Sequence, residues 1–306
     1  MKILVTGGSG MVGRELQEIL PDAIYPGRNE YDLTVQEQVN KMFRYIRPDV
    51  VIHLAATVSG IIDNIKRPCS HFEENILMNT FMVQAARKFE VGRFMAMLST
   101  CIYPDVAIRY PLHEEDIHDS APAESNFGYA YAKRALAVQI DTCNKQYGTN
   151  YSYMIPCNMY GRYDKFDEVR SHFMGALLAK IYDAEVNGRK YIELYGTGNP
   201  RRQFVYAKDV AKIIKYCIDN DIYQNMNIAP DQDNSIEGIA MEALIATGHS
   251  TMDVFFDRIK PDGQFNKNAS NKIFRNLLPD FNFTPLEQGI KETYAFYKQN
   301  AGKSSS

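Results

Sequence analysis

Lys2-Ile-Leu-Val-Thr6 runs directly into Gly7-Gly-Ser-Gly-Met-Val-Gly13, and this stretch decides the fold of the 306-residue chain. The short apolar run predicts a buried strand, and the glycines Gly7, Gly10 and Gly13 predict a tight turn into a helix. The N-terminus of such a helix offers N–H groups and a partial positive charge to a pyrophosphate. The stretch therefore predicts a Rossmann-type α/β fold that binds a dinucleotide; a purely structural glycine turn is the alternative.

The residues after the second expected strand, which ends near Ile24-Tyr25, bear on the identity of the dinucleotide. An NAD site often has an acidic residue here for the ribose 2'-hydroxyl. This chain has Arg28, which suits a 2'-phosphate, so we expect NADP(H); a solvated arginine is the alternative. Asp32 and Leu33 should lie near the adenine, in a turn before a helix that Thr34 caps.

Four more strands are expected, at Asp49–Ala56, Phe94–Ser99, Tyr151–Ile155 and Met226–Ile228, and a helix should open at His172. Ligands bind at the carboxyl ends of the strands in open parallel sheets. We expect His53 to be a core residue rather than a catalyst. From this edge and the glycine turn, the expected cofactor contacts also include Met11, Val12, Leu54, Ala55 and Ala56.

Ser99 ends one of these strands, where its hydroxyl could bind a substrate carbonyl. Cys101 would face the same cavity if the chain stays extended, because alternate residues of a strand point to one side. Taken alone, however, a thiol is more often buried and inert than reactive.

Tyr129-Ala-Tyr-Ala-Lys133 places a phenol and an ammonium four residues apart, on one face of a helix. A nearby ammonium would favour the ionised phenol and give a proton donor usable near neutral pH. Tyr294-Ala-Phe-Tyr-Lys298 repeats the spacing, but its surroundings indicate an ordinary amphipathic surface helix. By spacing alone, a structural tyrosine beside a solvated lysine remains an alternative for the first pair.

The composition is that of an ordinary globular protein, with 45% hydrophobic and 23% charged residues. A net charge of −3 and a pI near 6.1 give no general electrostatic reason to bind nucleic acid or an anionic membrane. Five cysteines without a Cys-x-x-Cys pair suggest neither a disulfide framework nor a zinc site, so no metal is expected. A reducing cytoplasm fits this pattern best, and no apolar run is long enough for a transmembrane helix.

The order of a glycine-rich turn, a strand-end serine and then Tyr-x-x-x-Lys resembles the extended short-chain dehydrogenase/reductase superfamily. The resemblance implies a doubly wound parallel sheet with a smaller C-terminal α/β substrate domain. It implies that Ser99, Tyr129 and Lys133 form the reducing triad, with Tyr129 and Lys133 also contacting the cofactor. It further implies a homodimer through helices around 72–89 and 128–147. The implied cofactor loop after the Tyr151–Ile155 strand contains Pro156, Asn158 and Met159.

Four longer strings resemble the GDP-L-fucose synthase family: Leu98-Ser-Thr-Cys-Ile-Tyr-Pro104, Asn126-Phe-Gly-Tyr-Ala-Tyr-Ala-Lys133, Gly196-Thr-Gly-Asn-Pro-Arg-Arg-Gln-Phe204 and Lys260-Pro-Asp-Gly263. The resemblance implies NADPH-dependent 3,5-epimerisation and 4-reduction of GDP-4-keto-6-deoxy-D-mannose. Cys101 would be the base and His172 the acid of epimerisation, and Arg202 and Lys260 would hold the diphosphate. The implied substrate contacts are Ser99, Asn158, His172, Tyr195, Arg202 and Lys260.

Some residues depart from that family pattern. This chain has Arg162-Tyr-Asp-Lys-Phe166 where the family usually has Pro-His-Asp-Asn-Phe. It has Tyr195 in place of a tryptophan, and Val58-Ser-Gly60 in place of Val-Gly-Gly. A related GDP-4-keto-deoxyhexose or heptose 4-reductase with a different sugar or incomplete epimerisation remains an alternative, as does a non-catalytic NADP(H)-binding protein. We expect an NADP(H)-binding domain from 1–161 and 203–222, a GDP-sugar-binding domain from 162–202 and 223–301, and a disordered tail at 302–306.

Overall fold

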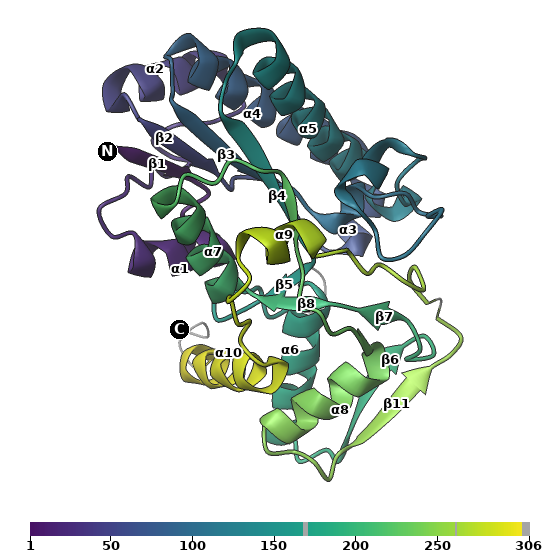
Figure 1. The fold of residues 1–306 in the computed structure, drawn as a ribbon. Helices are drawn as coiled ribbons and strands as arrows, with labels where there is room; N and C mark the ends of the chain where they lie inside the picture. Colours follow the sequence, from purple (N-terminus) through teal and green to yellow (C-terminus); the bar gives the residue numbers. More distant parts are fainter. Residues whose placement is uncertain (168–170, 261, 302–306) are drawn as a thin grey trace.

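A computed structural model describes residues 1–167, 171–260 and 262–301, so the tail expected at 302–306 lies outside the described residues. Five parallel strands form the main sheet, in the order β1-β2-β3-β4-β9 (Figure 1). Their bounds are Ile3–Thr6, Val50–His53, Arg93–Met97, Tyr151–Pro156 and Met226–Ile228. β2, β3, β4 and β9 are buried along their whole lengths, as is typical of parallel strands covered on both faces.

Helices cover both faces of this sheet. On one face lie α2 (Gln36–Ile46), α4 (Pro68–Lys88) and α5 (Phe127–Tyr147), and on the other lie α1 (Met11–Ile19) and α7 (Ala207–Asp219) (Figure 1). Each group of helices packs its apolar side chains on the sheet in a separate core cluster. The expected doubly wound Rossmann-type sheet is therefore confirmed.

The second expected strand is reduced to a single bridge. Ile24 N–H donates to Ile3 O (2.8 Å), Val5 N–H donates to Ile24 O (2.9 Å), and the ladder ends there. Pro26, two residues after Ile24, lacks the N–H that the next rung of the ladder would need. From β1 the chain thus goes to Ile24 on one side and later returns to β2 on the other, which makes the end of β1 the switch point of the sheet.

The expected cap of α2 is also wrong. The helix begins after Val35, and Thr34 uses its hydroxyl to donate to Asp32 Oδ1 (2.7 Å). Thr34 N–H donates to the same oxygen (2.9 Å), so the carboxylate closes a local turn and the threonine hydroxyl is no longer free to cap.

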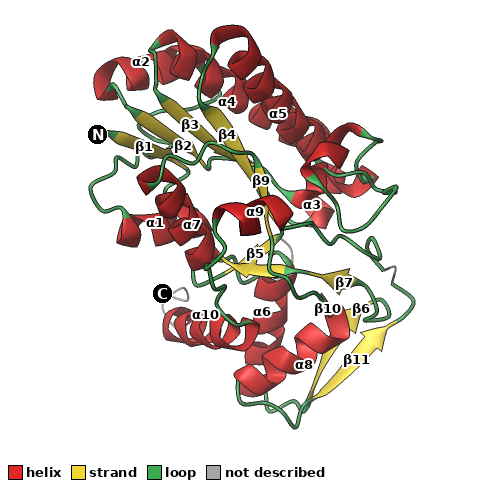
Figure 2. Cartoon of the chain, viewed as in Figure 1, coloured by secondary structure: helices red, strands yellow, loops and turns green. Residues whose placement is uncertain are grey.

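The remaining elements form a smaller lobe below the sheet (Figure 2). Its third core cluster lies between three helices and short paired strands, with β6 parallel to β11, β5 parallel to β8, and β7 antiparallel to β10. Its strands are β5 (Asn158–Tyr160), β6 (Tyr191–Tyr195), β7 (Arg201–Arg202), β8 (Phe204–Tyr206), β10 (Asn234–Ser235) and β11 (Asp253–Asp257). Its helices are α6 (Phe173–Val186), α8 (Ile236–Ala246) and α10 (Leu286–Ala301).

Three short elements complete the connections: α3 (Ile61–Lys66), α9 (Lys272–Leu277) and the 3-10 turn η1 (Thr100–Ile102), besides two further 3-10 turns at Glu114–His118 and Glu124–Asn126. β9 belongs to the main sheet and α9 packs beside it, although the sequence-based boundary assigns both to the substrate domain. Within the described ranges, no helix is both long enough and apolar enough to cross a membrane.

A buried ion pair connects the smaller lobe to α1. Glu15 on α1 is fully buried, and Arg162, which follows β5, meets it with two bonds, Nε to Oε1 at 3.1 Å and Nη2 to Oε2 at 2.5 Å. Arg162 also contacts Glu18 Oε2 (2.8 Å). Because the Glu15 carboxylate is withdrawn from water, removing its partner would leave a buried charge without compensation.

We predict that Arg162→Met lowers the free energy of unfolding by about 3–5 kcal/mol, for the reason just given. Urea unfolding followed by circular dichroism measures it. The double variant Glu15→Gln/Arg162→Met removes both charges and should recover most of the loss. A double variant no more stable than Arg162→Met would show that the loss does not come from the unpaired carboxylate.

Candidate active site

A continuous cleft of about 1930 Å³ runs along the carboxyl ends of the strands and on into the smaller lobe. Every residue expected to bind the cofactor lines it: Gly7, Gly10, Met11, Val12, Gly13, Arg28, Asp32, Leu33, Leu54, Ala55, Ala56, Tyr129, Lys133, Pro156, Asn158 and Met159. Ser99, Cys101, His172, Tyr195 and Arg202 line the same cleft. Lys260 does not; its ammonium lies 5.8 Å from the centre of the Tyr195 ring.

The glycine turn brings α1 close against the end of β1. Gly7 has φ of 75°, and a Cβ on it would lie 2.7 Å from Ala55 N. A Cβ on Gly13 would lie 2.3 Å from Gly7 O, so only glycine fits. Gly10 caps α1 without a side chain, which leaves the first-turn N–H groups uncapped beside the cleft. Such a cradle fits the pyrophosphate of a dinucleotide.

Tyr129 and Lys133 both point from α5 into the end of the sheet, and both are buried. Lys133 Nζ donates to Met97 O at the end of β3 (2.8 Å) and lies 6.0 Å from the centre of the Tyr129 ring. Burial, followed by the charge of Cys101, raises the pKa of Tyr129 above its ordinary value of 10, and burial lowers the pKa of Lys133 to about 8. In the protein alone, burial therefore outweighs the lysine charge, and the expected shift of the phenol toward its ionised form near neutral pH is wrong. The phenol keeps its proton, as a proton donor must.

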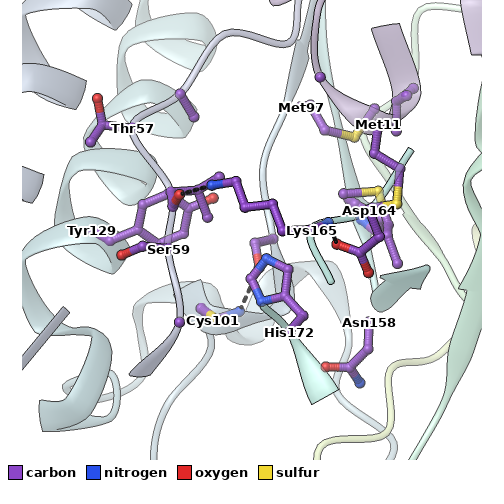
Figure 3. Close-up of a pocket in the computed structure, with 18 of the residues that line it drawn as sticks. Met11, Thr57, Ser59, Met97, Cys101, Tyr129, Asn158, Asp164, Lys165 and His172 are labelled. Carbon is purple, nitrogen blue, oxygen red and sulfur yellow. Dashed lines mark hydrogen bonds between the residues drawn. The ribbon is translucent and has the colours of Figure 1, made fainter. Parts of the chain in front are cut away.

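Ser99 and Cys101 reach the cleft through a turn rather than along an extended chain. Cys101 N–H donates to Ser99 Oγ (3.3 Å), and this bond caps the 3-10 turn η1. His172, as expected, opens α6 from the opposite wall. Desolvation within the cleft, and then the charge of Lys165, lower the pKa of His172. Figure 3 shows Cys101, Tyr129 and His172 around the same space.

Three further residues of the cleft were not predicted. Lys165 Nζ donates to Val58 O across the cavity (3.2 Å), and Lys267 Nζ lies 3.6 Å from Cys101 Sγ. Asp164 Oδ2 is buried and has no hydrogen-bond partner in the described part of the chain, and burial raises the pKa of this carboxyl to about 7. Lys165 and Val58 belong to stretches that depart from the family pattern, and this departure is the feature of the sequence that could have pointed to them. Lys267 lies 166 positions from Cys101, and no local pattern connects the two.

Two motifs have structural roles outside this cavity. His53 is fully buried, with Nδ1 bonded to Thr6 Oγ1 (2.8 Å), and burial lowers its pKa to about 3, so the expected core role is confirmed. Tyr294 and Lys298 do not line the cleft. Both instead donate to Glu185 on α6, each at 2.6 Å. Among the residues that the structure describes, no three His, Cys, Asp or Glu side chains are arranged to hold a metal ion.

This chain is similar to several known proteins over nearly its whole length. The sequence model of the NAD dependent epimerase/dehydratase family matches residues 3–229. A GDP-L-fucose synthase of Dictyostelium discoideum is 36% identical, with 97% of this chain and 95% of that protein covered. A GDP-L-colitose synthase of Yersinia pseudotuberculosis is 33% identical, with 97% and 98% covered. The crystal structure of a GDP-L-fucose synthetase from Naegleria fowleri bound to NADP has a TM-score of 0.89 and 32% identity, with 98% and 93% covered.

We predict that Gly13→Ala weakens dinucleotide binding by at least about tenfold, because the added methyl group forces α1 away from the turn. Fluorescence titration with NADPH measures the Kd. Gly92→Ala is the matched control, since a Cβ there would lie 3.6 Å from its nearest neighbour, Asp49 O. Equal Kd values for the two variants would contradict a cradle built on this close approach.

Proposed function

This chain belongs to the NAD dependent epimerase/dehydratase family, and we propose that it converts GDP-4-keto-6-deoxy-D-mannose to GDP-L-fucose with NADPH. The reaction would invert C3 and C5 and then reduce the ketone at C4. The observation that carries the proposal is the convergence of Cys101, Tyr129 and His172 on one cavity (Figure 3). A thiol, a phenol and an imidazole supply the base, the proton donor and the acid that the two stages need.

The residues present fit the cofactor. The uncapped turn of Gly10 and Gly13 would hold its pyrophosphate, and the exposed Arg28 at the cleft edge would meet the 2'-phosphate of NADPH. Met11 and Met159 line the same cleft. When bound, NADPH supplies the hydride that reduces C4.

Epimerisation would use the ketone to acidify the neighbouring carbons. The Cys101 thiolate would take the proton from C3 or C5 and form an S–H bond, while the C–H electron pair moves into an enolate on O4. Ser99 would hold that oxygen by a hydrogen bond. His172 would return a proton to the other face of the carbon. Its lowered pKa makes the imidazolium give up this proton readily once it has formed.

Reduction would follow in the same cavity. Tyr129 would give its phenolic proton to O4 as C4 is reduced, because its raised pKa keeps the group protonated beforehand. Lys133, held on Met97 O, would then support the phenolate with its positive charge. The phenol regains its proton from solvent before the next turnover.

The smaller lobe would bind the nucleotide end of the substrate. Arg202 and Lys260 are proposed for the diphosphate and Tyr195 for the base, with Asn158 beside the sugar. Two ammonium groups lie near the exposed Tyr195 ring, those of Lys180 (5.2 Å from its centre) and Lys260 (5.8 Å), which supports a role at an anionic ligand. We retain the division into an NADP(H) domain (1–161 and 203–222) and a GDP-sugar domain (162–202 and 223–301) as a proposal, with β9 and α9 as the exceptions.

The assembly and location are also proposals. We propose a homodimer through α4 and α5, whose partly exposed Phe72, Leu77 and Val138 offer apolar surface, and light scattering that detects only monomer would exclude it. The five free cysteines fit the reducing cytoplasm proposed for this enzyme.

A related GDP-4-keto sugar is the second candidate substrate. The contact between Lys165 and Val58 favours it. These two residues belong to stretches that depart from the family pattern, and they meet inside the cleft. A binding protein without activity is opposed by the intact set of Ser99, Tyr129 and Lys133 in one cleft.

Incubation with GDP-4-keto-6-deoxy-D-mannose and NADPH tests the proposed function. We expect loss of absorbance at 340 nm and GDP-L-fucose as the product by NMR. Tyr129→Phe should abolish NADPH oxidation, and Cys101→Ser should lose inversion at C3 and C5. NADPH oxidation with C3 or C5 uninverted would move the assignment to the second candidate. No oxidation despite NADPH binding would exclude this substrate.

The pH dependence of reduction provides a separate check. Turnover at saturating substrates should fall as the pH rises through about 8, because Lys133, with its pKa lowered to about 8, then loses the charge that supports the Tyr129 phenolate. Lys133→Met should be slow at every pH and should lack this fall. Wild-type turnover that stays level well above pH 8 would contradict the assignment.

A further inference from the structure

We propose that Lys267 is a positioning residue for Cys101, whose ammonium fixes the sulfur and favours its thiolate form. The inference deepens the proposed function, because a thiolate is the base that epimerisation requires. Lys267 Nζ lies 3.6 Å from Cys101 Sγ, within hydrogen-bonding distance of sulfur, and both residues line the cleft. An adjacent ammonium is one of the features that make a cysteine reactive.

The segment that carries Lys267 is fixed on both sides of it. Before the lysine, Arg201 N–H donates to Phe265 O (2.9 Å). After it, Leu112 N–H donates to Asn268 O (2.7 Å). These two ties hold the lysine backbone beside the cysteine turn, from which its ammonium reaches the sulfur.

The same segment is bonded to the chain just after Cys101. Gln264 Nε2 donates to Pro104 O (3.3 Å) and to Asp105 O (2.7 Å). These bonds fix the chain around Lys267 relative to the turn that contains Cys101. On the cysteine side, the N–H of Cys101 is bound to Ser99 Oγ. Both partners of the sulfur contact are thus positioned independently of any ligand.

Arg202 is a second cation near the sulfur, but its hydrogen bonds go to backbone carbonyls and not to Cys101. Its Nη1 donates to Arg201 O (2.7 Å) and its Nη2 to Gln264 O (2.5 Å), both backbone carbonyls. Lys267 instead directs its ammonium at Cys101 Sγ. We therefore assign the local charge on the sulfur to Lys267 and leave Arg202 to the diphosphate.

In the proposed step, the thiol first loses its proton to solvent, with Lys267 balancing the negative charge left on sulfur. The thiolate then takes the proton from C3 or C5, and the C–H electron pair passes to the enolate. Lys267 keeps its own proton throughout. Without the ammonium, a smaller fraction of Cys101 would be in the reactive form at neutral pH.

Alkylation of Cys101 by iodoacetamide tests this without a substrate. The rate is followed by peptide mass spectrometry between about pH 6 and pH 10, a range that includes the ordinary titration of a thiol. We expect Lys267→Met to slow alkylation at pH 7 by about fivefold to tenfold and to move the profile to higher pH, whereas Lys267→Arg should stay near wild type. Lys272→Met, at the start of α9, is the matched control and should change nothing.

The other cysteines report on the integrity of each variant. Cys69 is exposed on α4, so its alkylation rate should be the same in every variant. Cys143, Cys157 and Cys217 are buried and should remain protected if Lys267→Met is folded. An unchanged Cys101 profile in folded Lys267→Met would overturn the proposal.

A second experiment connects the contact to the chemistry. Deuterium uptake from D₂O at C3 and C5 of GDP-4-keto-6-deoxy-D-mannose, without NADPH, isolates the epimerisation half. Lys267→Met should lose about fivefold to tenfold in the rate of uptake, in line with its alkylation rate, with a much smaller change in KM. A raised KM with an unchanged maximal rate would overturn the positioning role and make Lys267 a substrate-binding residue. No uptake by wild type would refute the proposed function, and the alkylation profile would still decide the Lys267 proposal.

Discussion

The close approach of α1 to the end of β1 is the constraint on which the rest of the molecule depends. With 2.3 Å between Gly7 O and the place a Cβ on Gly13 would take, the backbone itself forms the packing surface. This fixes the helix start against the switch point of the sheet, where the chain leaves β1 for Ile24 and later returns as β2. The cleft, and every group proposed to act in it, is placed relative to that edge.

Burial, rather than charge alone, sets the chemistry available in the cleft. Tyr129 and Lys133 have the spacing that would let an ammonium lower the pKa of a phenol. Both are instead withdrawn from water, which raises the pKa of Tyr129 and lowers that of Lys133 to about 8. The result is a phenol that holds its proton beside an ammonium that can lose its own near neutral pH. This arrangement suits proton donation during reduction better than proton removal during oxidation.

Local sequence patterns predicted the elements whose determinants are local. The strand at Met226–Ile228 and the start of α6 after His172 agree with the sequence, because apolar runs and turn residues specify them. The patterns failed where a side chain or a missing N–H intervened. Pro26 stops the second strand, and Asp32 takes the hydroxyl expected to cap α2. Lys267 could not be found at all, since its contact with Cys101 depends on ties between segments distant in sequence.

In the proposed site, recognition of the pyrophosphate and of the 2'-phosphate of NADP(H) is divided unequally between backbone and side chains. The pyrophosphate cradle is built from main-chain groups, so it places few demands on side-chain chemistry. The residue proposed to read the 2'-phosphate, Arg28, is instead an exposed side chain next to a small turn in which Gly27 N–H donates to Glu30 Oε1 (2.9 Å). Substitution there disturbs neither a core cluster nor the buried pair Tyr129 and Lys133. A single surface substitution could therefore retune the proposed coenzyme preference while leaving untouched the groups that build the fold and those proposed for the chemistry.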